Sequence, residues 1–357
     1  MTIDFPGTFT KTHKWYKLPL PKGKACCSEG STYFATLKKG ASNKLVVFFG
    51  GGGLSWNEAS ASNPITIFSF INGKGLSYFP KIGLQELMKD GLLAENGKNN
   101  PFHEWNFILL PYATGDFHVG NNDFAYTDGK RKRRILHHYG ARNVTASLEA
   151  AKDLFPQPDQ LLIAGESAGA FGCIAQAAHI IDFFPNCKNI TVFSDSGQIS
   201  YPKWKETVRD IWKADRELWE CIQTNTLNLD WFRLLYNKLG NRVNYLNYCS
   251  YHDGLLSQFQ KKMNHDIYRL DKTGLEEFQV DLAKTQKALL QEIPGFHCYI
   301  SALHKNKKND STSHTASRYK SFYTKNADGI SLADWLDDAV NNGKLYNVGL
   351  DLLKPMM

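Results

Sequence analysis

The segment Gln160–Gly169 constrains the fold of this chain more than any other. Gln160–Ala164 is a short apolar run typical of a buried strand, Ala170–Ile181 has the composition of a buried helix, and Gly165-Glu-Ser-Ala-Gly169 joins them. Glycines two residues before and two residues after Ser167 permit a sharp turn at which strand and helix approach closely. Because such a turn exposes the serine hydroxyl at a helix start, Ser167 is predicted to be a nucleophile; a purely structural glycine-rich turn is the alternative.

Strand-like runs alternate with helical patterns along the chain, which predicts an α/β fold with a mainly parallel sheet flanked by helices. The other predicted strands are Thr32–Leu37, Lys44–Phe49, Trp105–Leu110, Asn189–Phe193 and Phe296–Ile300. Helical spacing predicts a helix over Asn143–Leu154, capped by Asn143 or Thr145, and a closing amphipathic helix over 330–340 with a Ser or Asp cap.

The chain is predicted to be one domain, residues 1–357, with an aromatic-rich helical insertion at 201–248. This insertion contains four tryptophans in helical stretches: Trp204, Trp212, Trp219 and Trp231. It is interpreted either as a cap over an active site or as a packed helical layer.

Charge and composition give only weak information about partners. The surplus of 42 Lys+Arg over 35 Asp+Glu is mild, and it slightly favours an anionic partner or substrate. The basic run Lys130–Arg134 follows a predicted hairpin turn at Tyr126–Lys130, so an exposed loop is expected there. Neither a nucleic-acid partner nor a membrane span is expected, because the chain has no aromatic-interleaved basic face and no long apolar run.

The start of the sequence, Met1–Gly7, lacks the charged and apolar pattern of a secretory signal, so a cytoplasmic location is expected. Seven cysteines without framework spacing are interpreted as reduced thiols: Cys26, Cys27, Cys173, Cys187, Cys221, Cys249 and Cys298.

Four glycines, Gly50–Gly53, follow the predicted strand Lys44–Phe49. Their backbone can approach a substrate carbonyl without side-chain obstruction, so the N–H of Gly52 or Gly53 is predicted to join that of Ala168 in an oxyanion hole. A dinucleotide-binding turn does not fit, because the third glycine of its motif would fall on Ser55 or Trp56.

A nucleophilic serine requires a histidine base and an orienting carboxylate, which in hydrolases of this fold follow in the order Ser, Asp, His. Asp253, in a turn before a helical segment, is the favoured carboxylate. His314 lies in a polar loop after the predicted strand Phe296–Ile300, and His304 is its competitor. The remaining candidate bases are His252, His265 and His297.

Several motifs then occur in a fixed order: Gly50-Gly-Gly-Gly-Leu-Ser-Trp56, Pro111-Tyr-Ala-Thr-Gly-Asp-Phe-His118, His137-His-Tyr-Gly140 with Asn143, Gly165-Glu-Ser-Ala-Gly-Ala170, Ser194-Asp-Ser-Gly197, Asp253-Gly254 with Phe259, His314-Thr315, Phe322-Tyr-Thr324, Gly329 and Asp334-Trp-Leu336. Together they resemble the pectin acetylesterase and Notum family of carboxylesterases, from about Gly30 to Leu336. The resemblance implies an α/β-hydrolase fold without metal or organic cofactor. It implies Ser167, Asp253 and His314 as the catalytic residues, and the glycine run as the oxyanion loop.

The resemblance leaves other positions less defined. The resemblance implies that Trp56 forms a wall of the substrate pocket. Core packing is the alternative, because Leu54 and Ser55 separate Trp56 from the glycines. Asp116 and His118, like His137 and His138, match family motifs to which no role is assigned; ordering the loops beneath the site is one interpretation. Ser55 and Ala113 stand where secreted relatives carry cysteines.

The predicted function is hydrolysis of an O-acyl ester, above all an O-acetyl group on a carbohydrate, through an acyl-enzyme. The competing hypotheses are a longer-chain acyl esterase acting on lipid or acylated protein, a catalytically silent binding protein on the same scaffold, and a serine peptidase. The natural substrate and the oligomeric state are not specified by the sequence.

Overall fold

The computed structural model describes residues 2–66, 90–94, 97 and 99–354. Nine strands form one sheet in the order β1-β2-β3-β5-β4-β8-β9-β10-β11, and the six strands from β5 to β11 in this order run parallel. The sheet strands are β1 (Ile3–Asp4), β2 (Trp15–Pro19), β3 (Phe34–Lys38), β4 (Lys44–Phe49), β5 (Asn106–Leu110), β8 (Gln160–Glu166), β9 (Asn189–Asp195), β10 (Val243–Ser250) and β11 (Phe296–Ser301).

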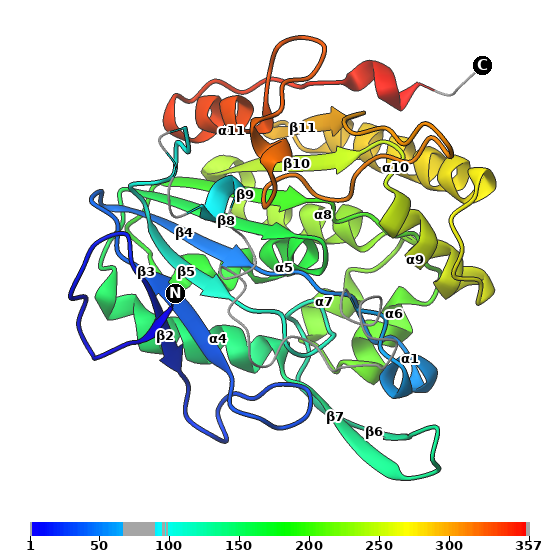
Figure 1. The fold of residues 1–357 in the computed structure, drawn as a ribbon, viewed down its shortest axis with the longest axis horizontal. Helices are drawn as coiled ribbons and strands as arrows, with labels where there is room; N and C mark the ends of the chain where they lie inside the picture. The colour runs from blue at the N-terminus through cyan, green and yellow to red at the C-terminus, as the bar shows by residue number, and fades with distance from the viewer. Residues whose placement is uncertain (1, 67–89, 95–96, 98, 355–357) are drawn as a thin grey trace.

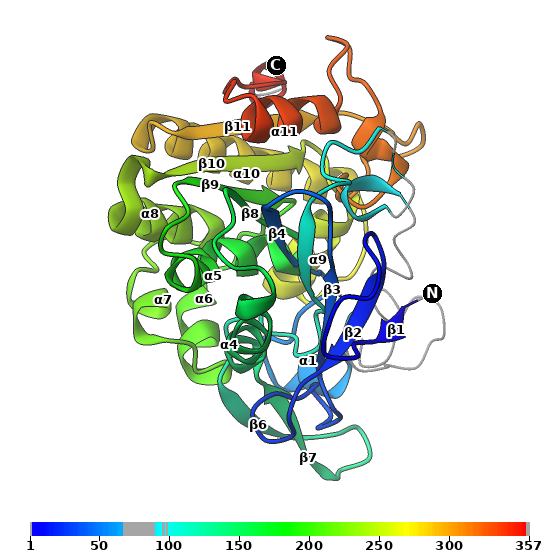
Figure 2. The same ribbon diagram turned by 90° about the vertical axis from the view of Figure 1, so that its left-hand side faces the viewer.

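Helices cover both faces of this sheet (Figures 1 and 2). The α-helices of the described residues are α1 (Glu58–Ser62), α4 (Gly140–Ala151), α5 (Ala168–Phe183), α6 (Trp204–Glu206), α7 (Arg216–Glu220), α8 (Leu227–Leu239), α9 (Gly254–His265), α10 (Lys272–Glu292) and α11 (Leu332–Asn341). The sheet has a hydrophobic core on each face, and alternate residues of β4 pack into one core or the other. Val47 packs in the larger core with α4, α5, α8 and α10, whereas Val46 and Phe48 pack in the core covered by α11. The predicted mainly parallel α/β sheet is confirmed.

The predicted strands agree with the observed ones to within two residues, but one helix start differs. Helix α4 begins at Gly140 rather than at Asn143, and no side chain caps it. Instead, the side-chain amide of Asn143 accepts a hydrogen bond from the Cys26 N–H and donates one to the Cys26 carbonyl. The cap prediction was therefore wrong, because a tertiary contact uses the polar side chain. The predicted Ser cap of the closing helix is confirmed at Ser331, which accepts from the Asp334 N–H.

The insertion predicted at 201–248 is helical only as far as Arg242. Residues 243–250 form β10, which pairs with β9 and β11 inside the main sheet. Trp204 and Trp212 are completely buried and contact Phe117 at ring-centroid distances of 5.6 and 5.1 Å. These contacts favour the packed helical layer over the cap.

The predicted hairpin is present as β6 (Asn122–Thr127) and β7 (Arg133–His138), and the basic run Lys130–Arg134 lies exposed at its tip. All seven cysteines are free thiols. Within the described residues, no helix combines the length and apolar character needed to cross a membrane.

The turn at Ser167 depends on glycines at which no side chain can be accommodated. A Cβ added at Gly169 would lie 2.1 Å from the Phe49 carbonyl oxygen, and one at Gly165 would lie 2.0 Å from the Gly169 carbonyl oxygen. Strand β4, strand β8 and helix α5 therefore approach at backbone distance.

We predict that Gly169→Ala lowers the free energy of unfolding by about 2 kcal/mol or more, because the added methyl group overlaps backbone that cannot move aside. Urea denaturation measures this change. Gly129→Ala is the matched control, since nothing lies within 4 Å of a Cβ at that position. Equal stability of the two variants would contradict the close approach described here.

Candidate active site

The carboxyl ends of the parallel strands bring the predicted site residues to one edge of the sheet (Figure 1). The glycine run follows β4, Ser167 follows β8, Asp253 follows β10, and His314 lies in the loop after β11. Segments far apart in the sequence thus meet at this edge. Ser167 and His314 line the same pocket, together with Gly51, Gly52, Gly53, Thr66, Leu255, Phe259, Thr315 and Arg318.

Ser167 has the backbone conformation expected of a nucleophile elbow. Its φ of 54° and ψ of −121° lie in a region that residues other than glycine rarely adopt. Its N–H donates to the Asp195 carbonyl at 2.8 Å, and its carbonyl accepts from the Ala170 N–H at 3.0 Å. These bonds hold the strained turn, and the half-buried side chain faces the pocket from the start of α5.

Asp253 and His314 form a buried pair. The Nδ1 of His314 donates to the Oδ2 of Asp253 at 2.7 Å. The other oxygen of Asp253 accepts the N–H groups of Leu255 and Leu256 at the start of α9. This tautomer leaves the His314 Nε2 lone pair free, and that atom is buried without a hydrogen-bond partner among the described residues.

Three carboxylates control the protonation of His314. Burial alone would lower the pKa of His314, but the charge and hydrogen bond of Asp253, followed by the charges of Asp195 and Glu166, raise it above 6.5. The imidazole is therefore positioned to accept a proton and to be stabilised once it is charged.

The glycine run lies directly against the Ser167 turn. A Cβ at Gly51 would lie 2.6 Å from the Ser167 Cβ and 3.3 Å from the Ala168 nitrogen. Gly52 and Gly53 line the pocket with Ser167. The structure thus brings together all three predicted sources of oxyanion N–H groups, Gly52, Gly53 and Ala168.

Asp116 and His118 support this glycine run from below. The Nε2–H of His118 donates to the Gly50 carbonyl at 2.9 Å, and burial lowers the pKa of His118 to about 4, so the ring is neutral at pH 7. Asp116 accepts the N–H groups of His118 and Gly140 and the hydroxyl of Thr114, while burial raises its pKa to about 6. These contacts agree with the interpretation that the two residues order the loops beneath the site.

Asp195 holds the loop that carries His314, a role that the sequence motifs did not indicate. Its Oδ2 accepts from the N–H groups of Ala316 and Ser317 and from the Ser317 hydroxyl, at 3.0, 2.8 and 2.6 Å. Its Oδ1 accepts from the Ser196 hydroxyl. Burial raises the pKa of Asp195, whereas these donors favour its charged form. The one sequence feature that could have indicated this role is the position of Asp195 at the end of β9, the strand that pairs with β8.

Glu166 and Arg318 form a second buried interaction at the pocket wall. The Nη1 of Arg318 donates to the Oε1 of Glu166 at 2.8 Å, and the Arg318 side chain is only 12% exposed. Burial raises the pKa of Glu166, against the effect of the Arg318 charge. The charged residue next to Ser167 therefore has a cationic partner. Local sequence patterns do not predict this pairing, because 152 positions separate the two residues.

The remaining candidate residues lie away from the pocket. His304 is exposed and makes no hydrogen bond or ion pair with a carboxylate of the described residues, so His314 is the candidate base that meets Asp253. Trp56 is 5% exposed in the larger core and lines a neighbouring hollow rather than the Ser167 pocket. His137 bonds Asp123 on the hairpin, and His138 is buried with its Nδ1 on the Thr114 carbonyl.

Comparison with known proteins shows which family and which fold this chain resembles. The family model for pectinacetylesterase matches residues 20–213, which is more than half of the chain. Two crystal forms of the Wnt deacylase Notum from Drosophila superpose with TM-scores of 0.63 and 0.62 at 17% sequence identity. The matches cover 93% of this chain and 95% and 94% of theirs. No similar sequence is found among curated proteins.

The structural likeness shows an α/β-hydrolase fold, and the family match identifies the chain as a serine ester hydrolase. The chain belongs to the pectinacetylesterase family.

We predict that Asp195→Ala lowers turnover of p-nitrophenyl acetate by about tenfold to 100-fold, because the loop carrying His314 loses its anchor. The free energy of unfolding should also fall by about 2–5 kcal/mol, since buried N–H groups are left unpaired. Asp195→Asn should retain much of both, because its amide oxygen can accept from Ala316 and Ser317. The matched control is Asp128→Ala, which removes a carboxylate that accepts two backbone N–H groups on the distant hairpin. Full turnover by folded Asp195→Ala would refute the anchoring role.

Proposed function

We propose that this enzyme hydrolyses O-acyl esters, above all O-acetyl esters of carbohydrates, with Ser167 as nucleophile, His314 as base and Asp253 as the residue that orients the base. The observation that carries this proposal is the 2.7 Å hydrogen bond between His314 and Asp253 in a loop that borders the Ser167 pocket.

The reaction follows from this geometry. The Nε2 of His314 removes the Ser167 proton while the Ser167 Oγ bonds to the ester carbonyl carbon, and the carbonyl oxygen takes the negative charge. N–H groups of Ala168 and of Gly52 or Gly53 stabilise that oxyanion. When the tetrahedral intermediate collapses, the carbon–oxygen ester bond breaks and the alcohol leaves with the proton from His314. Water then attacks the acyl-enzyme by the same route, which releases the acid and restores Ser167.

The pocket beside Ser167 is small, with a cavity volume of about 20 Å³. A short acyl group therefore requires less widening of this pocket than a long one. The name of the family, pectinacetylesterase, describes the same chemistry on an acetylated saccharide.

A longer acyl chain is the second candidate, and a neighbouring hollow of about 540 Å³ provides the space for it. Trp56, Ile65 and Met263 supply apolar lining beside polar residues such as Asn57 and Lys262, whereas Thr66 and Phe259 line the Ser167 pocket. Residues 65 and 66 are adjacent in the chain, and residues 259 and 263 are one turn apart on the same face of α9. The hollow therefore lies next to the Ser167 pocket. The structurally similar Notum is described as a Wnt deacylase.

A silent binding protein and a serine peptidase receive less support. A binding protein on this scaffold would have no need of a serine, an imidazole and a carboxylate kept at one pocket edge. A serine peptidase would use the same groups, and amide substrates in the same assay distinguish it.

A cytoplasmic location remains a proposal. The seven free thiols, and the presence of Ser55 and Ala113 where secreted relatives carry cysteines, are what supports it.

We predict that Ser167→Ala and His314→Ala each lower kcat by about 10⁴-fold or more, because the acyl-enzyme step needs both groups. His304→Ala should leave kcat unchanged, since its exposed side chain lies outside the pocket lining. Steady-state kinetics with p-nitrophenyl acetate, with circular dichroism to confirm folding, measures these effects. If His304→Ala is the variant that loses turnover, the assignment of the base is wrong.

We also predict that kcat/KM falls steeply from acetate to octanoate in a series of p-nitrophenyl esters. The reason is that chains longer than a few carbons exceed the Ser167 pocket. A rise towards octanoate would instead support the longer-chain candidate, with the neighbouring hollow as its acyl site. Met263→Trp is the companion variant, because its larger side chain narrows that hollow. It should lower kcat/KM only for the longer-chain esters.

A further inference from the structure

We propose that His13, His103 and Glu104 form a binding site for one divalent transition-metal ion, with zinc as the ion the ligand set fits best. The site is independent of the proposed ester hydrolysis. His13 lies in the loop between β1 and β2, and His103 and Glu104 directly precede β5. The amino end of β5 lies at the opposite edge of the sheet from the Ser167 pocket.

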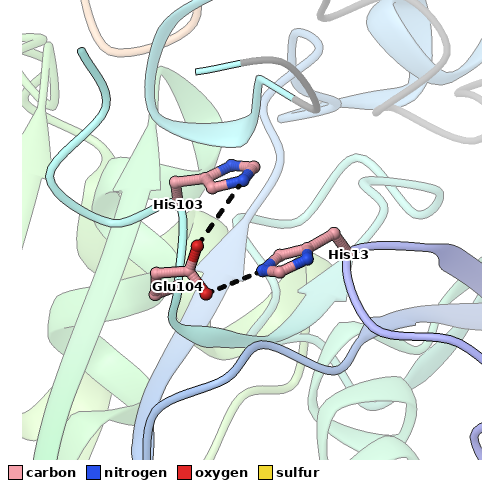
Figure 3. A group of neighbouring side chains, drawn as sticks. All are labelled: His13, His103 and Glu104. Atoms are coloured by element: carbon pink, nitrogen blue, oxygen red, sulfur yellow. Dashed lines mark hydrogen bonds and ion pairs between the residues drawn. The ribbon is translucent and has the colours of Figure 1, made fainter. Parts of the chain in front are cut away.

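Three potential ligand atoms converge at this place. Figure 3 shows ring nitrogens of both histidines turned towards the Glu104 carboxylate. The Nε2 of His13 lies 2.8 Å from Oε2 of Glu104, and the Nε2 of His103 lies 3.8 Å from Oε1. The ligand atoms all fall within 4.8 Å of one another, and within the described residues no other group of three or more His, Cys, Asp or Glu side chains meets that condition.

The donor set is suited to zinc. Two imidazole nitrogens and one carboxylate oxygen are a common three-ligand set for tetrahedral Zn²⁺, which leaves one position for water. Magnesium prefers six oxygen ligands and is not expected to bind. The His13 and His103 rings are stacked, with centroids 4.6 Å apart and an interplanar angle of 5°. Binding therefore requires these partly exposed side chains to rotate so that both nitrogens point at one ion.

His13 presents its Nε2 to the Glu104 carboxylate, to which it donates a hydrogen bond in the metal-free state. On binding, that proton moves to Nδ1, and the Nε2 lone pair faces the ion.

The backbone beneath the ligands is held in place. The His13 N–H donates to the Lys39 carbonyl at 2.7 Å. The N–H and hydroxyl of Ser42 both donate to the Glu104 carbonyl, and the Lys38 ammonium donates to the His103 carbonyl at 3.0 Å. His13 also has a φ of 57°, a conformation that few non-glycine residues adopt. The ligands therefore project from a preformed surface, although His13 and His103 lie far apart in the sequence.

A bound ion would cross-link the amino-terminal segment to the rest of the fold. A shared ion would connect the loop before β2 to the start of β5, and would stabilise the folded state in proportion to its occupancy.

The test is titration of the metal-free full-length protein with ZnCl₂ at pH 7.5 by isothermal calorimetry, with melting temperature as a second readout. We expect one zinc per chain at this site, a melting temperature raised by a few degrees and no response to Mg²⁺. His103→Ala and Glu104→Gln should each weaken binding by at least about tenfold and abolish the rise in melting temperature. Esterase turnover should be unchanged in both.

His137→Ala is the matched control, because His137 forms a single imidazole–carboxylate pair with Asp123 and its replacement should leave zinc binding as in the unaltered protein. His13→Ala provides a second ligand variant if His103→Ala fails to fold. Absence of saturable zinc binding by the unaltered protein, or undiminished binding by the folded ligand variants, would overturn the proposal.

Discussion

The close approach of three backbone segments at Ser167 is the constraint on which the rest of the site depends. A Cβ at Gly51 would meet the Ser167 side chain, and a Cβ at Gly169 would meet the carbonyl oxygens of Phe49 and Gly50. Only glycines allow β4, β8 and α5 to come this close. That proximity forces Ser167 into its strained conformation and places its side chain beside unobstructed main chain. A wider turn would separate the Ser167 side chain from the glycine run.

Around this turn, buried carboxylates have separate tasks. Asp253 binds the imidazole directly, Asp195 holds the loop after His314, and Asp116 orders the segment that leads to helix α4. Each accepts backbone N–H groups, so each charge is stabilised by fixed dipoles rather than by water. The negative charges of Asp253 and Asp195, with that of Glu166, also raise the pKa of His314. The loops at the carboxyl edge of the sheet are therefore fixed largely by the same groups that set the electrostatics of the site.

Local patterns predicted the sheet strands and the elbow because those features depend on neighbours in sequence. Lys44–Phe49 and Gln160–Ala164 are apolar runs typical of buried strands, and the glycine spacing around Ser167 defines the turn. The order of family motifs also predicted Asp253 and His314 as site residues. Their contact is present in the structure, while their catalytic roles remain proposals.

Features that depend on tertiary contacts could not be predicted from local sequence patterns. The start of α4 was misplaced because Asn143 binds Cys26, 117 positions away, and the end of the helical insertion was misplaced because β10 joins the sheet. The pairing of Glu166 with Arg318 has no local signal of any kind. The convergence of His13 with His103 is likewise visible only once β2, β3 and β5 are assembled.

The proposed role of Ser167 as an activated nucleophile can be tested by labelling the folded protein with a fluorophosphonate, followed by mass spectrometry of its peptides. We expect one phosphonyl group per chain, on Ser167, with labelling lost after heat denaturation. Modification of a different serine, or no reaction of the folded protein, would show that this role is wrong.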